Sequence, residues 1–499
     1  MLFNSFQFLI FFPIVTLIYF IIPKKFKYLW LLASSYYFYM CWEPRYILLI
    51  LFSTVATYLC ALLLEKEKKG KAELKNKIII GVCIVVNIGI LTIFKYAGFI
   101  LASFSSLLGL AGISMEPKQI NLLLPVGISF YTFQALGYII DVYRKKVSAE
   151  HNFFKYALFV SFFPQLVAGP IERSKNLLAD IEDIPKKKLL DYDRITGGLM
   201  LMLYGMFLKL VIADRICLPA DYIFNDPSAM GSLELIIGAL CFTIQIYCDF
   251  AGYSTIAIGA AKVMGFTLME NFDTPYFALS IRDFWRRWHI SLSTWFRDYL
   301  YIPLGGSRCS RTRKYLNLMI TFLVSGLWHG AGWHFVAWGG LHGAYQVIGD
   351  MTDSLRDRLC NKLRIKRVGI FVSLIRRFIT FLLVAYAWVF FRADSLKNAL
   401  TITKRMITGG ESANGLAGLI NIDLCGMNEL EWCILSGAFL MMLIFSLVRY
   451  LKKKTPDAFL SDCRLPVKWL ILYILIFAIL IFGKYGPGYS QQAFIYFQF

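Results

Sequence analysis

The chain has 499 residues, of which 58% are hydrophobic and 17% are charged, and its formal net charge is +20. An average soluble domain carries about 25% charged residues, and a soluble protein has too little interior to bury this much apolar surface. The composition therefore excludes a soluble enzyme, a disordered chain and a nucleic-acid-binding domain. It predicts a protein that crosses a membrane several times.

The basic residues stand in short clusters between apolar runs, at 24–27, 65–77, 144–146, 364–377 and 451–454. Clusters of this kind are typical of cytoplasmic loops, whereas a nucleic-acid partner would require a basic soluble face. We therefore expect a membrane and no nucleic acid as the partner. The same rule places both termini, residues 105–120 and residues 393–431 outside. No basic residue precedes the first apolar run, so we expect that run to be a span and not a signal peptide.

A membrane-spanning helix needs about 20 mostly apolar residues. In chain order, such stretches lie at 5–22, 28–42, 46–64, 78–104, 121–140, 154–171, 195–213, 233–264, 315–349, 374–391, 432–450 and 467–484. The second is short, and 315–349 is too long for one simple helix. Together they predict an all-α polytopic membrane protein with about eleven transmembrane or re-entrant segments. Residues 265–314 interrupt the pattern, because they are charged and rich in Trp.

The interruption contains a dense run of Arg and Trp at 282–297. On one continuous helix with about 100° per residue, one stripe collects Arg282, Arg286, His289, Ser293 and Arg297, and another face collects Trp285, Trp288, Leu292 and Trp295. Such a helix lies in the membrane interface, or enters the membrane where protein shields it. It either anchors the surface through Trp or lines a site for an anionic group such as a phosphate, which guanidinium binds at two points.

Three of the five histidines, His329, His334 and His342, lie in one apolar stretch. An ionisable residue at membrane depth is a functional candidate by default, and histidine transfers protons near neutral pH. A structural role for any one of them stays open. Their spacing does not match the zinc-binding HExxH pair, and the eleven cysteines form no CxxC pair, so no metal site is predicted.

With these residues in view, the sequence resembles the membrane-bound O-acyltransferase (MBOAT) family, and within it the bacterial alginate, peptidoglycan and exopolysaccharide O-acetylases. The matching stretches lie at 282–289, 291–293, 295–299, 327–330, 340–343 and 388–393, and earlier at 124–130 and 163–171. The similarity covers nearly the whole length. It implies helices around a central tunnel in a single membrane domain over 1–499. Within it, a catalytic core at 265–348 and an extracytoplasmic loop at 393–431 are expected.

The resemblance also implies roles for individual residues. His329, in the Trp-His-Gly motif, matches the essential histidine of the family, and His289 matches a second implicated histidine, so both are expected to be catalytic. His334 and His342 have weaker claims. Donor or substrate binding is expected of Arg282, Trp285, Arg286, Trp288, Ser293, Arg297 and Trp328. No bound cofactor is expected.

The implied function is O-acyl transfer, with acetyl as the expected group. A thioester donor on the cytoplasmic side, acetyl-CoA or a carrier-protein thioester, passes the acetyl group across the plasma membrane to a hydroxyl of a cell-surface polysaccharide or exopolysaccharide. A separate extracytoplasmic acetyltransferase is the expected partner. His329 would take the hydroxyl proton, while His289 or an arginine of the stripe stabilises the oxyanion or orients the acyl group.

Two alternatives stay open. D-alanyl transfer to teichoic acid belongs to the same family, but members of that branch tend to be shorter and lack counterparts of residues 393–431 and two further spans. A transporter or flippase without chemistry predicts charged residues spread over several spans. Here the unusual polar residues concentrate in 282–298 and 325–343, which favours one reaction centre.

Overall fold

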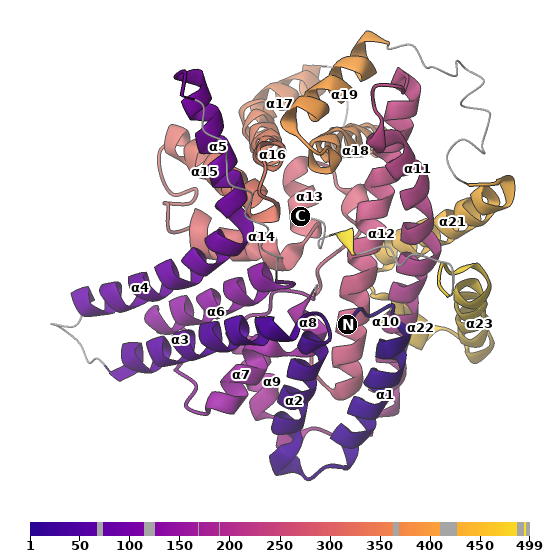
Figure 1. Cartoon of the computed structure of the whole chain (residues 1–499). Helices are drawn as coiled ribbons and strands as arrows, with labels where there is room; N and C mark the ends of the chain where they lie inside the picture. The colour runs from indigo at the N-terminus through magenta and orange to yellow at the C-terminus, as the bar shows by residue number, and fades with distance from the viewer. Residues whose placement is uncertain are drawn as a thin grey trace. The chain divides into compact units, whose positions relative to one another are not determined.

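The computed structural model describes residues 1–66, 73–113, 125–167, 169–188, 190–362, 369–409, 427–486 and 494–495. Within these ranges the chain is helical and has no β-strand, which confirms the predicted all-α fold class (Figure 1). These residues belong to two compact units: Met1–Leu199 with Ala257–Met269, and Met200–Ile256 with Glu270–Phe499. The single membrane domain over 1–499 stays a prediction.

The first unit holds α1 (Phe6–Ile21), α2 (Lys27–Met40), α3 (Ile47–Lys66), α4 (Glu73–Leu91), α5 (Ala97–Leu110), α6 (Ile128–Tyr143), α7 (Phe153–Ser161), α8 (Phe163–Leu166) and α9 (Ser174–Glu182). Buried polar side chains link its apolar helices. Ser53 of α3 donates to Asn87 of α4 at 2.6 Å, and the Tyr156 hydroxyl of α7 donates to Thr57 of α3 at 2.7 Å. Such bonds fix helix contacts where hydrophobic burial alone is not directional.

Two helices, α10 (Tyr192–Met206) and α12 (Ser232–Met264), contribute residues to both units. The second unit also holds α11 (Asp214–Asn225), α13 (Ile281–Arg287), α14 (Ile290–Phe296), α15 (Arg311–His329), α16 (Trp333–Met351), α17 (Asp353–Lys362), α18 (Ile370–Arg392), α19 (Leu396–Thr408), α21 (Glu429–Lys452), α22 (Pro456–Asp462) and α23 (Leu465–Phe482). Every residue predicted for catalysis or binding lies in this unit. Helix α19 falls inside the predicted loop 393–431, of which residues 410–426 lie outside the described ranges.

Seven helices of the described chain are long and apolar enough to cross a membrane: Pro44–Lys66, Glu73–Leu110, Tyr192–Asn225, Ser232–Met264, Ile370–Arg392, Glu429–Lys452 and Leu465–Phe482. The predicted number of about eleven is not confirmed. The predicted segment 154–171 is divided between α7 and α8, and 315–349 between α15 and α16. In both places the apolar residues continue across the helix boundary, so the apolar pattern alone does not predict where one helix ends and the next begins.

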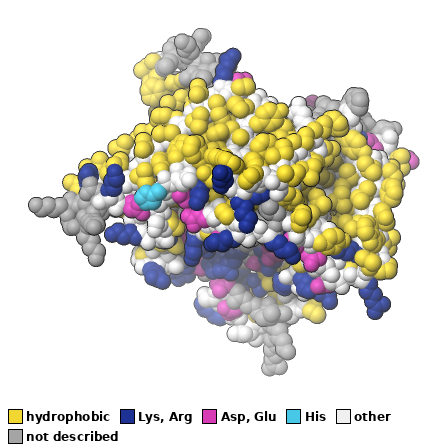
Figure 2. All heavy atoms as spheres, turned by 90° about the horizontal axis from the view of Figure 1, so that it is seen from below, with side chains coloured by type: hydrophobic (Ala, Val, Ile, Leu, Met, Phe, Trp, Pro, Cys, Tyr) yellow, Lys and Arg dark blue, Asp and Glu magenta, His cyan; other side chains and the backbone are white. Residues whose placement is uncertain are grey.

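Large apolar side chains remain exposed on these helices. On α23, Leu480 is 60% exposed and Ile481 is 65% exposed. The face in Figure 2 shows hydrophobic side chains over a broad area, with Lys and Arg gathered beside it. Soluble proteins rarely expose contiguous apolar area of this extent, because water contact with it is unfavourable. These surfaces fit a lipid environment.

A buried ion cluster lies in the second unit. The ammonium of Lys209, in the π-helical turn Phe207–Ala213, lies 2.8 Å from the carboxylate of Asp214 and 2.7 Å from that of Asp249. Asp249 of α12 also accepts a hydrogen bond from the backbone N–H of Ile495 at 2.8 Å. Because buried charges persist only when they are paired, this cluster ties the turn to α11 and α12.

Candidate functional site

Residues 282–297 do not form one helix, so the predicted continuous stripe is wrong. Helix α13 ends at Arg287 and α14 begins at Ile290. Between them Trp288 is extended, with φ −106° and ψ 128°, and His289 is left-handed, with φ 43° and ψ 55°. That conformation is strained for a residue other than glycine. The break turns both side chains into the interior, where each is 0% exposed.

Backbone hydrogen bonds from a distant loop stabilise this break. The N–H of Ile290 donates to the carbonyl of Asn271 at 3.0 Å, and the N–H of Asp273 donates to the carbonyl of Arg287 at 2.9 Å. A broken helix leaves backbone groups that need such partners when they are buried. Since the partners lie well outside the segment, its own periodicity cannot reveal them. This is the physical reason why the single-helix prediction fails.

Asn271 also fixes the imidazole of His289. Its side-chain Oδ1 accepts hydrogen bonds from the N–H of Ser291 at 3.3 Å and the hydroxyl of Ser291 at 2.8 Å, and it lies 3.2 Å from Nδ1 of His289. A backbone N–H can only donate, so the Asn271 atom facing it is the oxygen. That oxygen can only accept, which assigns the proton of a neutral His289 to Nδ1 and leaves Nε2 as the acceptor.

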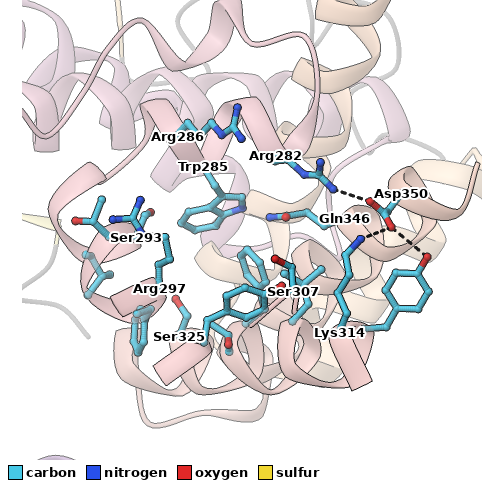
Figure 3. A pocket seen from close by; sticks show the side chains of 18 of the residues that line it. Arg282, Trp285, Arg286, Ser293, Arg297, Ser307, Lys314, Ser325, Gln346 and Asp350 are labelled. Atoms are coloured by element: carbon cyan, nitrogen blue, oxygen red, sulfur yellow. Dashed lines mark hydrogen bonds and ion pairs between the residues drawn. The ribbon is translucent and has the colours of Figure 1, made fainter. Parts of the chain in front are cut away.

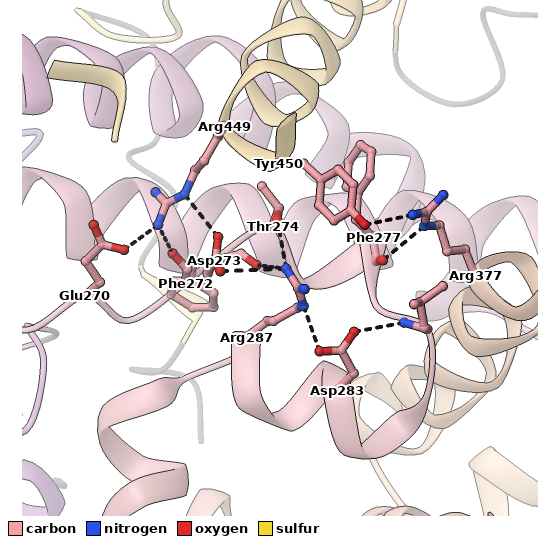
Figure 4. A network of polar contacts seen from close by, with 11 residues as sticks. Glu270, Phe272, Asp273, Thr274, Phe277, Asp283, Arg287, Arg377, Arg449 and Tyr450 are labelled. Atoms are coloured by element: carbon pink, nitrogen blue, oxygen red, sulfur yellow. Dashed lines mark hydrogen bonds and ion pairs between the residues drawn. The ribbon is translucent and has the colours of Figure 1, made fainter. Parts of the chain in front are cut away.

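Polar contacts hold the loop that precedes α13 (Figure 4). Arg449 of α21 lies 2.5 Å from Glu270 and 3.4 Å from Asp273. Arg287 of α13 lies 2.9 Å from Asp283 and 3.6 Å from Asp273. Both guanidinium groups are largely buried, where an ion pair is screened less by solvent than at the surface. Their shared carboxylate on Asp273 ties α13 and α21 to the loop that carries Asn271.

His329, the other predicted catalytic residue, is the last residue of α15 and is 3% exposed. Aromatic rings surround it, with ring centroids at 4.9 Å for Trp338, 5.0 Å for Trp328 and 5.5 Å for Phe391. Its centroid lies 6.4 Å from that of His289. The fold thus brings the two predicted catalytic histidines together in a dry, aromatic setting, where polar interactions are stronger than in water.

Helices α15 and α16 hold His329 through an unusually close backbone contact. A Cβ placed on Gly326 of α15 would lie 2.2 Å from the carbonyl oxygen of Phe335, and one on Gly339 of α16 would lie 2.2 Å from that of Phe322. Two backbones approach this closely only through small residues. The crossing leaves the hairpin little freedom to shift, which fixes the position of His329.

A cavity of about 560 Å³ is lined by residues of α13, α14, α15 and α16 and of the turn that follows α14 (Figure 3). Four cations line it, Arg282, Arg286, Arg297 and Lys314, together with hydroxyl, amide and aromatic side chains. The lining also includes Ile290, adjacent to His289 in the chain, and Ser325, one helical turn before His329. The cavity can therefore hold an anionic group at one part of its wall while another part of the wall borders the histidine segments.

One carboxylate, Asp350 of α16, organises part of this wall. It accepts hydrogen bonds from Lys314 at 2.7 Å, Arg282 at 2.8 Å and the hydroxyl of Tyr315 at 3.1 Å. These donors, Lys314 foremost, lower the pKa of Asp350 to about 2. Asp350 is therefore ionised at neutral pH and holds two of the cavity cations in place.

The structure divides the residues predicted for donor or substrate binding. Five of them line the cavity: Arg282, Trp285, Arg286, Ser293 and Arg297. Trp288 and Trp328 do not line it, and they are buried within the aromatic cluster around the two histidines. His334 is not part of the cavity lining, and His342 is 0% exposed next to Trp285. The roles of all these residues stay predictions.

Sequence reasoning missed Asn271 and the acidic member of the cavity, Asp350. Asp350 directly follows the apolar stretch 315–349, and an isolated carboxylate at such an end is a signal that could have found it. Asn271 gives no such signal, because an asparagine in a polar loop is ordinary. Among the described residues, no group of three or more His, Cys, Asp or Glu side chains gathers to hold a metal ion.

Comparison with known proteins gives one family. The family model described as MBOAT, membrane-bound O-acyltransferase family, matches residues 144–393. The chain is 37% identical over 466 residues to a Pseudomonas aeruginosa protein named probable alginate O-acetylase, across 92% of this chain and 84% of that protein. It is 33% identical over 550 residues to the peptidoglycan O-acetyltransferase of Helicobacter pylori, and the match covers 100% of this chain and 98% of that protein. A teichoic acid D-alanyltransferase of Streptococcus thermophilus is 32% identical over 273 residues, and the match covers 50% of this chain and 64% of that protein.

The chain belongs to the membrane-bound O-acyltransferase family, as its motifs predicted. It is therefore an O-acyltransferase and a multi-pass membrane protein. The matched residues 144–393 include both histidines and every residue that lines the cavity.

Proposed function

We propose that this protein moves an acetyl group from a cytoplasmic thioester donor across the membrane, and that a partner transferase delivers it to a hydroxyl group of a cell-envelope polysaccharide or exopolysaccharide. The observation that carries the proposal is the pairing of His289 and His329, with centroids 6.4 Å apart, together with a cavity that is lined by four cations and by Ile290 and Ser325 of the histidine segments. The relatives that overlap most of the chain are named for O-acetylation of alginate or peptidoglycan. The D-alanyltransferase relative overlaps half of it.

In this proposal His329 is the general base. It takes the proton of the acceptor hydroxyl while the hydroxyl oxygen attacks the thioester carbonyl. A carbon–oxygen bond forms, the carbon–sulfur bond breaks, and the leaving thiolate takes the proton from His329. The reaction is balanced without a further reagent, and the net result is one ester and one thiol.

His289 orients the reacting groups. With its proton on Nδ1 toward Asn271, its Nε2 is an acceptor, which suits a hydroxyl more than an oxyanion. Arginine remains the better donor for the negative charge of the transition state, because guanidinium stays protonated at every working pH. The two histidines therefore take different parts, and the loss of either lowers the rate.

The cavity binds the anionic end of the donor, and acetyl-CoA is the donor that fits best. Arg282, Arg286 and Arg297 offer guanidinium groups, which match phosphate oxygens in bidentate fashion. On the outer side, a separate acetyltransferase passes the acetyl group to the polymer. The acetyl group thus crosses the membrane while the charged donor stays on the cytoplasmic side.

Membrane vesicles from a host that lacks its own copy test the donor and its side. Inverted vesicles carrying the chain, the acceptor polymer and the partner receive acetyl-CoA labelled in the acetyl group. We expect base-labile labelled ester from inverted vesicles and none from right-side-out vesicles, whose cytoplasmic face is enclosed. Ester formed from right-side-out vesicles, or formed only from a D-alanyl carrier thioester, would contradict the proposal.

The cavity has its own control pair. Arg286→Gln removes one cavity cation, and we expect the KM for acetyl-CoA to rise about fivefold, equal to about 1 kcal/mol, with kcat little changed. Arg45→Gln removes a cation whose side chain is 92% exposed in the first unit, and it should change neither constant. Equal KM values for wild type and Arg286→Gln would show that the donor binds elsewhere.

A further inference from the structure

Two tryptophan rings in contact link the cavity lining to His329. Trp285 lines the cavity and is itself 8% exposed. Its ring centroid lies 5.7 Å from that of Trp338, and the Trp338 centroid lies 4.9 Å from that of His329. Trp338 is 0% exposed and stacks on Trp388 at 5.5 Å. The Trp338 ring therefore contacts both the cavity-lining indole of Trp285 and the imidazole of His329.

The indole of Trp285 is held in one orientation. Its N–H donates to Nδ1 of His342 at 3.2 Å. Its ring makes edge-to-face contacts with His342 and Phe322, with ring centroids 5.1 Å and 5.3 Å apart. Both partners come from the closely crossed hairpin of α15 and α16. Rotation of the indole would leave the N–H and the imidazole nitrogen without partners in an apolar interior, which costs about 1–3 kcal/mol.

The tautomer of His342 follows from this bond. An indole N–H can only donate, so Nδ1 of His342 is the acceptor and a neutral ring carries its proton on Nε2. His342 is 0% exposed and does not line the cavity. His342 acts on the cavity through Trp285, so we treat His342 as a positioning residue.

We propose that Trp285, held by His342, limits the transferred acyl group to a short chain. In this proposal, an acyl group that reaches His329 from the cavity lies against the rings of Trp285 and Trp338. An acetyl group adds one methyl beyond its carbonyl, whereas each further methylene needs space that these rings occupy. Close-packed aromatic walls yield little to an added methylene. This inference rests on the proposed acyl transfer and gives the acyl selectivity of the same site.

The test is a competition between acetyl-CoA and butyryl-CoA in the vesicle assay, read as the ratio of butyryl to acetyl ester. Wild type should transfer acetyl with strong preference. Trp285→Ala should raise the ratio at least tenfold, since one methylene in a tight pocket changes selectivity by about 10- to 200-fold. Trp285→Phe, which keeps an aromatic ring of smaller size, should raise it less.

Two further comparisons separate the wall from general damage. His342→Asn keeps an acceptor near the position of Nδ1 and should keep the wild-type ratio, whereas His342→Leu removes the acceptor and should raise the ratio. Trp295→Ala removes a buried tryptophan of α14 that does not line the cavity, and it should leave the ratio unchanged. A loss of folding lowers both esters together and does not move the ratio.

Each other result overturns the inference. A wild type that transfers butyryl as readily as acetyl has no such wall, and a ratio unchanged in Trp285→Ala and Trp285→Phe places the limit elsewhere. Loss of every acyl transfer in both variants, at normal membrane levels and melting temperature, makes Trp285 necessary for transfer and not for chain length. If wild type transfers no acyl group, the proposed function itself fails, which is a separate and distinguishable outcome.

Discussion

The crossing of α15 and α16 offers a sharp perturbation, Gly339→Ala. The new Cβ would lie 2.2 Å from the carbonyl oxygen of Phe322, whereas ordinary contact begins at 3.4 Å, so the two backbones must separate by about 1.2 Å. His329 ends α15 and would move with it. A displacement of about 1 Å at a reacting group costs about 100-fold in rate, or about 2.7 kcal/mol of transition-state stabilisation. We expect kcat for acetyl transfer to fall by that factor.

The neighbouring residue supplies the control. A Cβ on Gly340 meets Leu323 Cδ2 at 3.5 Å, which is ordinary contact, so Gly340→Ala should keep activity within about twofold of wild type. Both variants carry the same added methyl group in the same helix, and initial rates are compared at equal membrane levels. Activity of Gly339→Ala equal to that of Gly340→Ala would refute the reasoning that the backbone crossing positions His329.

Two further predictions concern buried polar groups of the second unit. Asn271→Ala removes the acceptor that faces His289 and Ser291, so the rate of acetyl transfer should fall at least tenfold. Asn271→Asp keeps an acceptor and should retain more activity. Equal rates for the two variants would contradict the assigned tautomer of His289. Lys209→Met leaves the carboxylates of Asp214 and Asp249 buried without the lysine cation, which should lower the free energy of unfolding by about 3–5 kcal/mol. In detergent, this loss should appear as a lower melting temperature. An unchanged melting temperature would contradict a stabilising role for the ion cluster.

Helicity, membrane insertion and family could all be predicted from the sequence, because long apolar runs and the stretches around 282–299 and 327–330 are local signals. The break at Trp288 and His289 could not. No glycine or proline marks it, and its stabilising bonds come from Asn271 and Asp273 in another segment. The break places His289 in the interior and not on one continuous stripe with the arginines, as the single-helix prediction had it.

The cavity shows the same limit. Three of its arginines were predicted on one stripe, and Arg282, Arg286 and Arg297 do line one cavity although two helices and a break carry them. The role of His342 required the tertiary structure, because its setting between two glycines reads equally well as helix packing. Only the hydrogen bond from the Trp285 indole points to the positioning role proposed for the imidazole.

Base-labile acetate on the envelope polysaccharide is the most direct measure of the central claim that the chain is an acetyltransferase acting through His329. A host without its own copy carries wild type, His329→Ala or the control His151→Ala, which removes an exposed histidine paired with Glu65, together with any partner protein. We expect ester-linked acetate from wild type and His151→Ala and none from His329→Ala at matched membrane levels. Equal acetate from all three would make His329 structural and contradict the mechanism.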